Sequence, residues 1–421
     1  MNEKLLQFIW KMQYFNTKSI TTVAGELITI IHKGTYNTNQ GPDFINAQIK
    51  IGNTTLVGNI ELHVLATDWD AHKHSTDANY QNIILHVVWQ HNYNGVVIHN
   101  YPVLELAPYV AKSMLEQYSM LQLKPKYIPC EQQINKVPAL QLNNWKERLV
   151  LERLERKTNE ILLHISANTL DWETILWHKL AANFGTKVNS EAFAAMASTI
   201  PIAILAKNKP SQLTIESLLL GQAGMLNDAY TDAYALLLQK EHTYLANKYK
   251  LTQSAIPVQY LRMRPYTFPG IRLSQLASLI HQSTKLFRFI IECESYKQLL
   301  QLLHVKANDY WHYHYTLHDD AGTYKEKYIG IDMQHNIIIN TVIPCVFAYG
   351  TFTQNQHLKD KALLWLEQIP TEVNSIVKGF KNLYVSSRTA ADSQALIELK
   401  NTYCTTKRCM ECTVGAYILK S

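Results

Sequence analysis

Short runs in which apolar and polar residues alternate fill the first part of the chain, a pattern typical of β-strands with one buried face. Four such runs cover residues 26–32, 44–51, 54–65 and 83–89. The dipeptide Gly52-Asn53, between the second and third runs, favours a hairpin. A further pair of short strands is expected around 96–99 and 103–106, and residues 3–15 indicate a short amphipathic helix in front of the strands.

Behind residue 110 the apolar positions follow the helical period. Residues 262–272 contain two prolines and predict a loop, whereas 310–315 and 337–346 are typical of strands or of deeply buried segments. The helical runs cover residues 150–162, 174–182, 191–197, 215–220, 228–249 and 273–286, and the polar stretch 67–81 is long enough for a helix between two strands. We therefore expect an α/β or α+β front domain with a small mixed sheet, followed by a larger, mainly helical region. The predicted divisions are 1–110, 111–250 and 251–421.

Composition places the chain among globular proteins. It has 421 residues, of which 47% are hydrophobic, and only 15 Gly and 13 Pro. No apolar run approaches the roughly 18 residues that cross a bilayer, and the N-terminus lacks the pattern of a signal peptide. Six cysteines are too sparse for a disulfide scaffold and indicate a reducing compartment. The expectation is a soluble cytoplasmic protein with no membrane contact.

The charge changes along the chain. Residues 1–110 hold six Lys, no Arg and eight acidic residues, together with seven of the 17 His, whereas the rest has 34 basic and 26 acidic residues. This distribution is either ordinary drift in composition or the sign of a cation site in front and a surface that tolerates polyanions behind.

Asp43, Glu61 and His63 form the most informative group. Asp43 begins one predicted strand, and Glu61 and His63 lie two residues apart on the next, so that their side chains share a face. If the strands pair as a hairpin, Asp43 comes alongside Glu61. Carboxylates with a third donor on one face suit Mg²⁺ or Mn²⁺, and such an ion supports phosphodiester hydrolysis. The alternative is a surface hairpin with ordinary solvated acids.

This layout resembles the PD-(D/E)XK nuclease superfamily over about residues 20–90. In that superfamily an Asp opens one strand, Glu-x-Lys lies on the next strand, and a helix and a further strand follow. Pro42-Asp43 matches the first element and Glu61-Leu62-His63 the second, with His63 in place of the Lys. The resemblance implies a metal-dependent nuclease in which Asp43 and Glu61 bind the ion. The His implies a changed mechanism, a different metal or lost activity, because a Lys is a fixed cation and a His is neutral or a metal ligand at pH 7.

Over its whole length the chain is similar to an uncharacterised family of Bacteroidota proteins, domain of unknown function 2851. The matching signatures are GPDFINAQIKI, GNIELHVLATDW, DAHKH, FGTKVN, RMRPYTFPGIR and the Cys-rich end. This resemblance implies a bacterial cytoplasmic protein and supplies no activity.

Two further groups of metal-binding side chains stand out. Asp70, His72, His74 and Asp77 either extend the site beside Glu61 or belong to a solvated loop, and His86, in an apolar run, is typical of a core histidine. Near the C-terminus, three thiols have the spacing of zinc or iron–sulfur ligands, with a fourth expected from a loop behind the front domain. The four candidate ligands are Cys130, Cys404, Cys409 and Cys412. The alternative is that these residues are reduced structural thiols.

A basic loop is a candidate for nucleic-acid contacts. Arg262, Arg264 and Arg272 are interleaved with Tyr266 and Phe268. The arginines could contact phosphates while the aromatic rings stack on bases. The alternative is a surface loop whose arginines pair with neighbouring acids. The sequence contains no Walker loop, Rossmann glycine fingerprint, Gly-x-Ser-x-Gly elbow or His-Glu-x-x-His helix, which disfavours nucleotide hydrolysis, hydride transfer and serine hydrolase chemistry.

The predicted activity is metal-dependent hydrolysis of phosphodiester bonds in DNA or another nucleic acid. Asp43 and Glu61 would bind the ion, and His63 would position or deprotonate the attacking water. The first alternative is a non-catalytic nucleic-acid-binding or scaffold protein with a degenerate nuclease fold. The second is a metal-dependent hydrolase of a small substrate that uses the same face.

Overall fold

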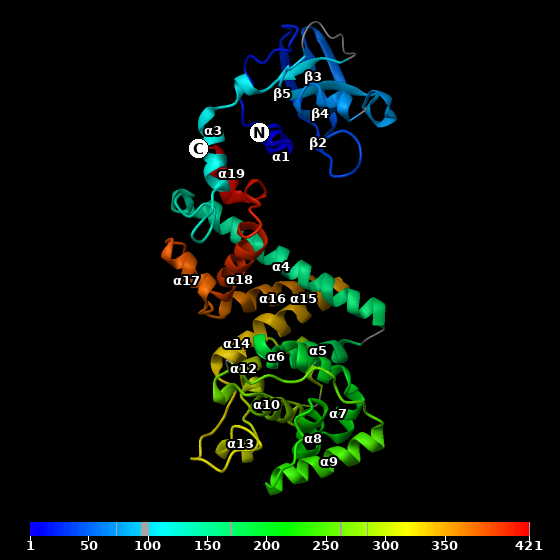
Figure 1. The fold of residues 1–421 in the computed structure, drawn as a ribbon, viewed down its shortest axis with the longest axis vertical. Coiled ribbons are helices and arrows are strands. Elements are labelled where there is room, and N and C mark those ends of the chain that lie inside the picture. The colour runs from blue at the N-terminus through cyan, green and yellow to red at the C-terminus, as the bar shows by residue number, and fades with distance from the viewer. Residues whose placement is uncertain (73, 94–100, 169–170, 262, 284, 421) are drawn as a thin grey trace. The chain divides into compact units, whose positions relative to one another are not determined.

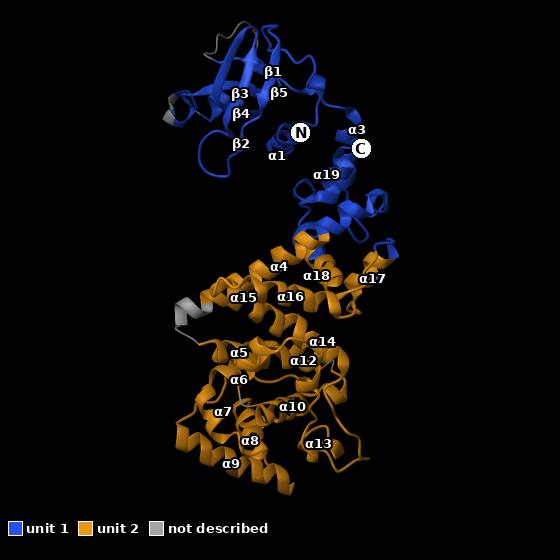
Figure 2. Cartoon of the chain, turned by 180° about the vertical axis from the view of Figure 1, so that it is seen from behind, with its two compact units in different colours: residues 1–145, 382–385, 399–421 blue, residues 146–381, 386–398 orange. Residues whose placement is uncertain are grey.

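The computed structural model describes residues 1–420 except 73, 94–100, 169–170, 262 and 284 (Figure 1). The chain divides into two compact units (Figure 2). Unit 1 consists of residues 1–145, 382–385 and 399–421, and unit 2 consists of residues 146–381 and 386–398. The C-terminal segment therefore returns to the unit that contains the N-terminus. The three-region division near residues 110 and 250 stays a prediction.

A six-stranded mixed sheet forms the front of unit 1, with the order β1-β3-β4-β5-β6 and β2 paired to β3. β3 pairs antiparallel with both β1 and β4, whereas β5 pairs parallel with both β4 and β6. Their bounds are β1 Ile28–His32, β2 Thr35–Tyr36, β3 Phe44–Ile51, β4 Thr54–Leu65, β5 Ile83–Gln90 and β6 Val103–Glu105. Of the two expected classes, α/β and α+β, the structure shows α+β, and the expected mixed sheet in front of a mainly helical region is confirmed. The expected strand at 96–99 lies outside the described residues.

The hairpin between β3 and β4 follows directly from the local sequence. Gly52 adopts φ +57°, a left-handed conformation that glycine enters without steric cost, and the pairing continues as Ile51↔Thr54. Alternate apolar residues of β3, including Ala47 and Ile49, are fully buried. The hairpin therefore has a defined register, and Phe44 pairs with Ile60 at its open end.

Helix α1 (Glu3–Met12) packs against β4. The Asn2 side chain accepts a hydrogen bond from the backbone N–H of Leu5 and caps the helix. The apolar face buries Leu6, Ile9 and Trp10 completely, so the expected amphipathic helix is confirmed.

The connection from β4 to β5 contains less helix than the 15-residue polar stretch predicted. It contains α2 (Asp68–Ala71) and the short 3₁₀ turns η1 (His74–Thr76) and η2 (Ala78–Tyr80). Carboxylates bind backbone N–H groups here: Asp68 accepts from Leu65, and Asp77 accepts from Asn79. Such local bonds compete with a continuous helix and break the crossover into turns.

The remainder of unit 1 is built from two segments that are far apart in the sequence. One comprises η3 (Ala107–Tyr109), α3 (Lys112–Gln122) and η4 (Ile134–Lys136), together with the start of α4 (Ala139–Asn168). The other comprises the π-helical η7 (Leu399–Cys404), the 3₁₀ turn η8 (Cys409–Glu411) and α19 (Thr413–Lys420). Helix α19 packs against α3.

Unit 2 is helical. Its neighbouring helices pack in pairs, among them α5 with α6, α8 with both α9 and α10, and α15 with α16. Beyond α4, its helices are α5 Trp172–Phe184, α6 Thr186–Ser198, α7 Ile202–Asn208, α8 Gln212–Gln222, α9 Ala233–Tyr249, η5 Pro265–Thr267, α10 Pro269–Gln282, α11 Leu286–Glu292, α12 Tyr296–Leu303, α13 Tyr310–Tyr313, α14 Ile331–Ile337, η6 Ile338–Val342, α15 Ile343–Phe352, α16 Gln356–Gln368, α17 Ser375–Asn382 and α18 Ala390–Glu398.

Two segments were expected to be either strands or deeply buried, and the structure makes both of them largely helical. Residues 310–315 and 337–346 are not strands: the first contains α13, and the second runs through a π-helical turn, η6, into α15. Ile338, Ile339 and Ile343 are fully buried, so the segment carries apolar residues on every side. An apolar run that is buried all round has no period that separates strand from helix.

The expected loop at 262–272 ends at Pro269, which opens α10. Proline suits the first helical turn because an N–H at that position would have no hydrogen-bond acceptor within the helix, so its absence costs nothing.

Among the described residues no single helix combines the length and apolar character needed to cross a membrane. The bent pair α6 and α7, which meet at 82°, passes the same test of length and composition when taken together.

Candidate metal centre

Asp43 and Glu61 lie side by side at the open end of the β3–β4 hairpin. The backbone N–H of Asp43 donates to Glu61 Oε2 at 2.9 Å, and the backbone N–H of Leu62 donates to Asp43 Oδ2 at 3.2 Å. The hairpin register, which pairs Phe44 with Ile60, places the two carboxylates next to each other. The structure thus brings together the two acids that the sequence singled out.

Helix α1 adds a third group that the sequence did not reveal. Gln7 Nε2 donates to Asp43 Oδ1 at 2.7 Å, and Tyr36 donates its hydroxyl proton to Gln7 Oε1 at 3.1 Å. The one available signal was that Glu3 and Gln7 stand four residues apart and so share a face of an otherwise apolar helix. Gln7 holds one oxygen of Asp43 in place.

His63 projects from the same face of β4 as Glu61. Its Nε2 lies 3.7 Å from Glu61 Oε1, and its Nδ1 forms a 2.9 Å hydrogen bond with Nε2 of His86 on β5. His86 pairs with Glu61 across the parallel strands and is fully buried, as expected of a core histidine. It also fixes the orientation of the His63 ring.

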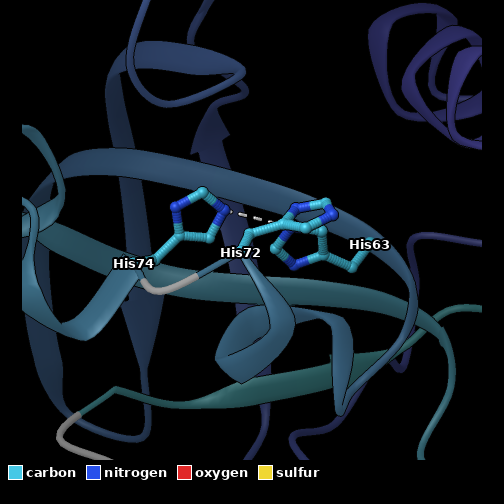
Figure 3. Close-up of side chains that lie close together, drawn as sticks. All are labelled: His63, His72 and His74. Carbon is cyan, nitrogen blue, oxygen red and sulfur yellow. Dashed lines mark hydrogen bonds between the residues drawn. The ribbon is translucent and has the colours of Figure 1, made fainter.

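The β4–β5 connection places two more imidazoles at this point. His74 Nε2 lies 3.5 Å from Glu61 Oε1 and 3.3 Å from His63 Nε2. One nitrogen from each of His63, His72 and His74 falls within 4.8 Å of the others (Figure 3). The His74 ring stacks on Tyr80 with ring centroids 3.9 Å apart, and His72 is exposed. The group is therefore buried on the sheet side and open to solvent at His72.

The surroundings shift the ionisation of each group. Burial raises the pKa of Asp43 and of Glu61, and the neighbouring Asp43 charge raises that of Glu61 further. Burial, followed by the charges of His74 and His72, lowers the pKa of His63 to about 3. The His74 pKa is also lowered, chiefly by burial. Two carboxylates that resist ionisation next to two imidazoles that resist protonation favour a bound cation, because a cation stabilises carboxylates and imidazole lone pairs alike.

The other two expected accessory groups lie elsewhere in the connection. Asp70 is exposed and accepts a 2.6 Å hydrogen bond from the Tyr93 hydroxyl. Asp77 binds the backbone and side chain of Asn79, and its charge raises the pKa of His74 without placing Asp77 among the three imidazoles.

The donors available are three imidazoles and two carboxylates. Imidazole nitrogen suits Zn²⁺ and other transition metals, whereas an all-oxygen site suits Mg²⁺. These residues fit a divalent ion, and the mixture fits Mn²⁺ or Zn²⁺ better than Mg²⁺. The expected Mg²⁺ or Mn²⁺ cofactor stays a prediction.

Residues 3–375 match a protein family described as "Protein of unknown function (DUF2851)". The chain belongs to the DUF2851 family. No curated protein and no solved structure matches the chain. The matched range includes Asp43, Glu61 and the three histidines. The likeness of residues 20–90 to PD-(D/E)XK nucleases finds no support in these comparisons and stays a prediction.

One arginine of the expected basic loop lies within a helix of this DUF2851 protein. Arg272 lies inside α10, is buried, and donates to Gln275 Oε1 at 2.9 Å. Arg264 is exposed and donates to the Tyr266 hydroxyl at 2.8 Å, and Arg262 lies outside the described residues. The helix that begins at Pro269 removes Arg272 from the surface. The nucleic-acid contacts expected of Arg262, Arg264 and Arg272 stay predictions.

The cysteines fall into two classes. Cys293 and Cys345 are buried in unit 2, as their apolar surroundings indicated. The other four all belong to unit 1, although one of them is separated from the rest by most of the chain: Cys130, Cys404, Cys409 and Cys412. All six are free thiols.

Proposed function

We propose that unit 1 hydrolyses phosphodiester bonds in DNA or another nucleic acid with a divalent metal ion at the Glu61 carboxylate. The observation that carries the proposal is the meeting of Asp43, Glu61 and His63 at one point, with His72 and His74 delivered by the connection to β5. The expected layout is also present in order: an Asp opens β3, Glu61-x-His63 lies on β4, and helix α2 and strand β5 follow.

The residues divide the work according to their environments. Glu61 and the histidines His63 and His74 would hold the ion, since Glu61 Oε1 lies within 3.7 Å of both rings. Asp43 would add a second carboxylate, and each of its oxygens keeps a lone pair beyond the hydrogen bond that it accepts. Burial makes His63 a weak base, which favours the role of ligand over that of proton acceptor.

A divalent ion held by Glu61, His63 and His74 would supply a water of lowered pKa and would neutralise charge on the phosphate. The water oxygen forms a bond to phosphorus while the bond from phosphorus to the leaving oxygen breaks. The water gives up one proton to solvent, and the leaving oxygen takes one up. His72 is exposed, so a large substrate can approach from its side.

A second candidate is a non-catalytic nucleic-acid-binding protein. The observation in its favour is that both oxygens of Asp43 and one of Glu61 already accept hydrogen bonds from the protein. In this reading the carboxylates brace the hairpin instead of binding an ion.

The test is cleavage of single- and double-stranded DNA and RNA by chelator-treated full-length protein after addition of Mg²⁺, Mn²⁺ or Zn²⁺. We expect cleavage with Mn²⁺ or Zn²⁺ and a rate about 10²–10⁴-fold lower in Asp43→Asn and Glu61→Gln. Glu105→Gln, on β6 of the same sheet, is the matched control and keeps the rate. Folded protein that binds nucleic acid but cleaves none with any of the ions would favour the second candidate.

A further inference from the structure

Four cysteines lie on two distant segments of unit 1 that hydrogen-bond to each other, and we call these residues the four-cysteine cluster: Cys130, Cys404, Cys409 and Cys412. The charge of each thiol affects others in the group. Those of Cys409 and Cys412 raise the pKa of Cys130, and Cys130 together with these two raises that of Cys404. The C-terminal segment supplies three thiols, and the loop between α3 and η4 supplies the fourth.

The cluster is sheltered from solvent. Cys404, Cys409 and Cys412 are 8%, 7% and 6% exposed, and Cys130 is half-buried. Burial raises the pKa of each thiol, to about 11 for Cys409, and the charges of neighbouring thiols raise the pKa of Cys130, Cys404 and Cys409 further. A thiophilic cation in their midst would turn the repulsion into attraction.

The backbone around Cys412 is arranged to stabilise a sulfur anion. Burial raises the pKa of its thiol, and hydrogen bonds from the backbone N–H groups of Gly415 and Val414 lower it. Donors that face the sulfur are the usual outer shell of a metal-bound thiolate. Two residues separate Cys409 from Cys412, which is the C-x₂-C spacing of zinc sites.

Two lysines complete the surroundings. Lys400 lowers the pKa of Cys404, and Lys407 lowers that of Cys409, so that both balance the negative charge of a metal with four thiolates. The same side chains tie the segments together, because Lys400 donates to the Tyr127 carbonyl and Lys407 to the Gln122 carbonyl.

Gly415 shows how tightly the C-terminal segment folds at the cluster. A Cβ at this position would stand 2.0 Å from the Cys409 carbonyl oxygen. Glycine at this position therefore allows α19 to approach the backbone of Cys409 in η8 closely.

We propose that the four-cysteine cluster is a metal centre of four thiolates, which takes either Zn²⁺ or iron as an iron–sulfur cluster. The centre links the C-terminal segment to the loop around Cys130 and so stabilises the contact between these two distant segments of unit 1. It is separate from the site at Glu61 in ligands and in chemistry, and it does not rest on the proposed hydrolysis. The family match ends at residue 375, before three of the four ligands, and so assigns this site no role.

The first experiment measures metal and acid-labile sulfide in the full-length protein purified without oxygen. We expect about one centre per chain, with zinc alone or with iron and sulfide in equal amounts. X-ray absorption at the metal edge then reports the ligands. A shell of sulfur only, at about 2.3 Å for zinc, supports the proposal.

Matched variants locate the centre. Cys404→Ser and Cys412→Ser should lower the metal content at least about tenfold, whereas Cys293→Ser, at a buried thiol of unit 2, should leave it unchanged. His63→Ala separates this centre from the Glu61 site, since sulfur-bound metal persists in it. Unaltered protein that contains no sulfur-bound metal overturns the proposal even if the cysteine variants fail to fold. So does metal that survives both cysteine substitutions.

Discussion

The His63 and His86 rings share a 2.9 Å hydrogen bond between Nδ1 of the first and Nε2 of the second. The bond occupies Nδ1 of His63 and leaves its Nε2 directed at Glu61 and His74. When Nδ1 carries the proton, the lone pair of Nε2 is available to a metal ion. A partner of this kind fixes the tautomer and the orientation of a metal-binding histidine. His86 is therefore a positioning residue for the candidate metal centre.

Replacing that partner should weaken the metal site without removing a ligand. We expect His86→Phe to lower the affinity for Mn²⁺ or Zn²⁺ about 10–100-fold, because His63 loses the group that orients it. Isothermal titration of chelator-treated protein measures the effect. Val87→Ala, at the next, fully buried position of β5, is the control: it loses stability and keeps the affinity. Equal affinity in His86→Phe and the unaltered protein would contradict the role given to His86.

Gln7 should tune the ionisation of Asp43. The hydrogen bond from Gln7 lowers the pKa of this carboxyl against the larger upward effect of burial. In Gln7→Leu the pKa of Asp43 rises further, so a proton competes with the metal up to a higher pH. The midpoint of metal binding as a function of pH should move upward, while in Met12→Ala, an exposed change on the same helix, it should stay in place. A downward shift would be inconsistent with this hydrogen bond.

Glu216 should make unit 2 less stable as the pH rises. Burial raises its pKa from the usual 4.5 to about 7, and hydrogen bonds from Trp311, Tyr234 and Ser274 offset part of this. The folded form then binds the proton more tightly than the unfolded form. The resulting stability is complete below about pH 4.5 and is lost as the pH rises through 7, in total about 3 kcal/mol.

Urea unfolding at pH 4.5 and pH 8 tests this linkage. The side chain introduced in the Glu216→Gln variant cannot ionise. From pH 4.5 to pH 8, the free energy of unfolding of this variant should therefore increase by about 3 kcal/mol relative to that of the unaltered protein. Glu292→Gln, an exposed acid on α11, should show no such difference. A constant difference between Glu216→Gln and the unaltered protein would show that Glu216 stays ionised in the fold.

Gly415→Ala should damage unit 1 at the four-cysteine cluster. The added methyl group meets the Cys409 carbonyl oxygen, and we expect a loss of about 1–3 kcal/mol of unfolding free energy together with lower metal content. Gly330→Ala, where a Cβ meets nothing within 4 Å, is the control. Unfolding by urea and metal analysis give the two readouts. Full metal content in Gly415→Ala would place the metal away from Cys409 and Cys412.

Local patterns carried most of what could be predicted about the sheet. The runs 44–51 and 54–65 coincide with β3 and β4, because alternation and a glycine turn act between neighbouring residues. The same reasoning anticipated that Asp43 would lie beside Glu61. It could not reveal Gln7, whose contact with Asp43 depends on how α1 docks on the sheet. For the apolar run 337–346 the sequence left a strand or a deeply buried segment open, and the structure shows a buried helical one, since burial on all sides erases the period that distinguishes a strand from a helix.

The sequence by itself determined the hairpin, the mixed sheet followed by helices and the residue types at the site, since these depend on side chains close together in the chain. Tertiary structure alone decided between α/β and α+β, which imidazoles reach Glu61, that Arg272 is buried in α10, and that Cys130 belongs to the same unit as the C-terminal thiols. Such meetings depend on the packing of segments up to hundreds of residues apart. Short-range periodicity contains no information about that packing, whereas burial and charge in the folded chain do.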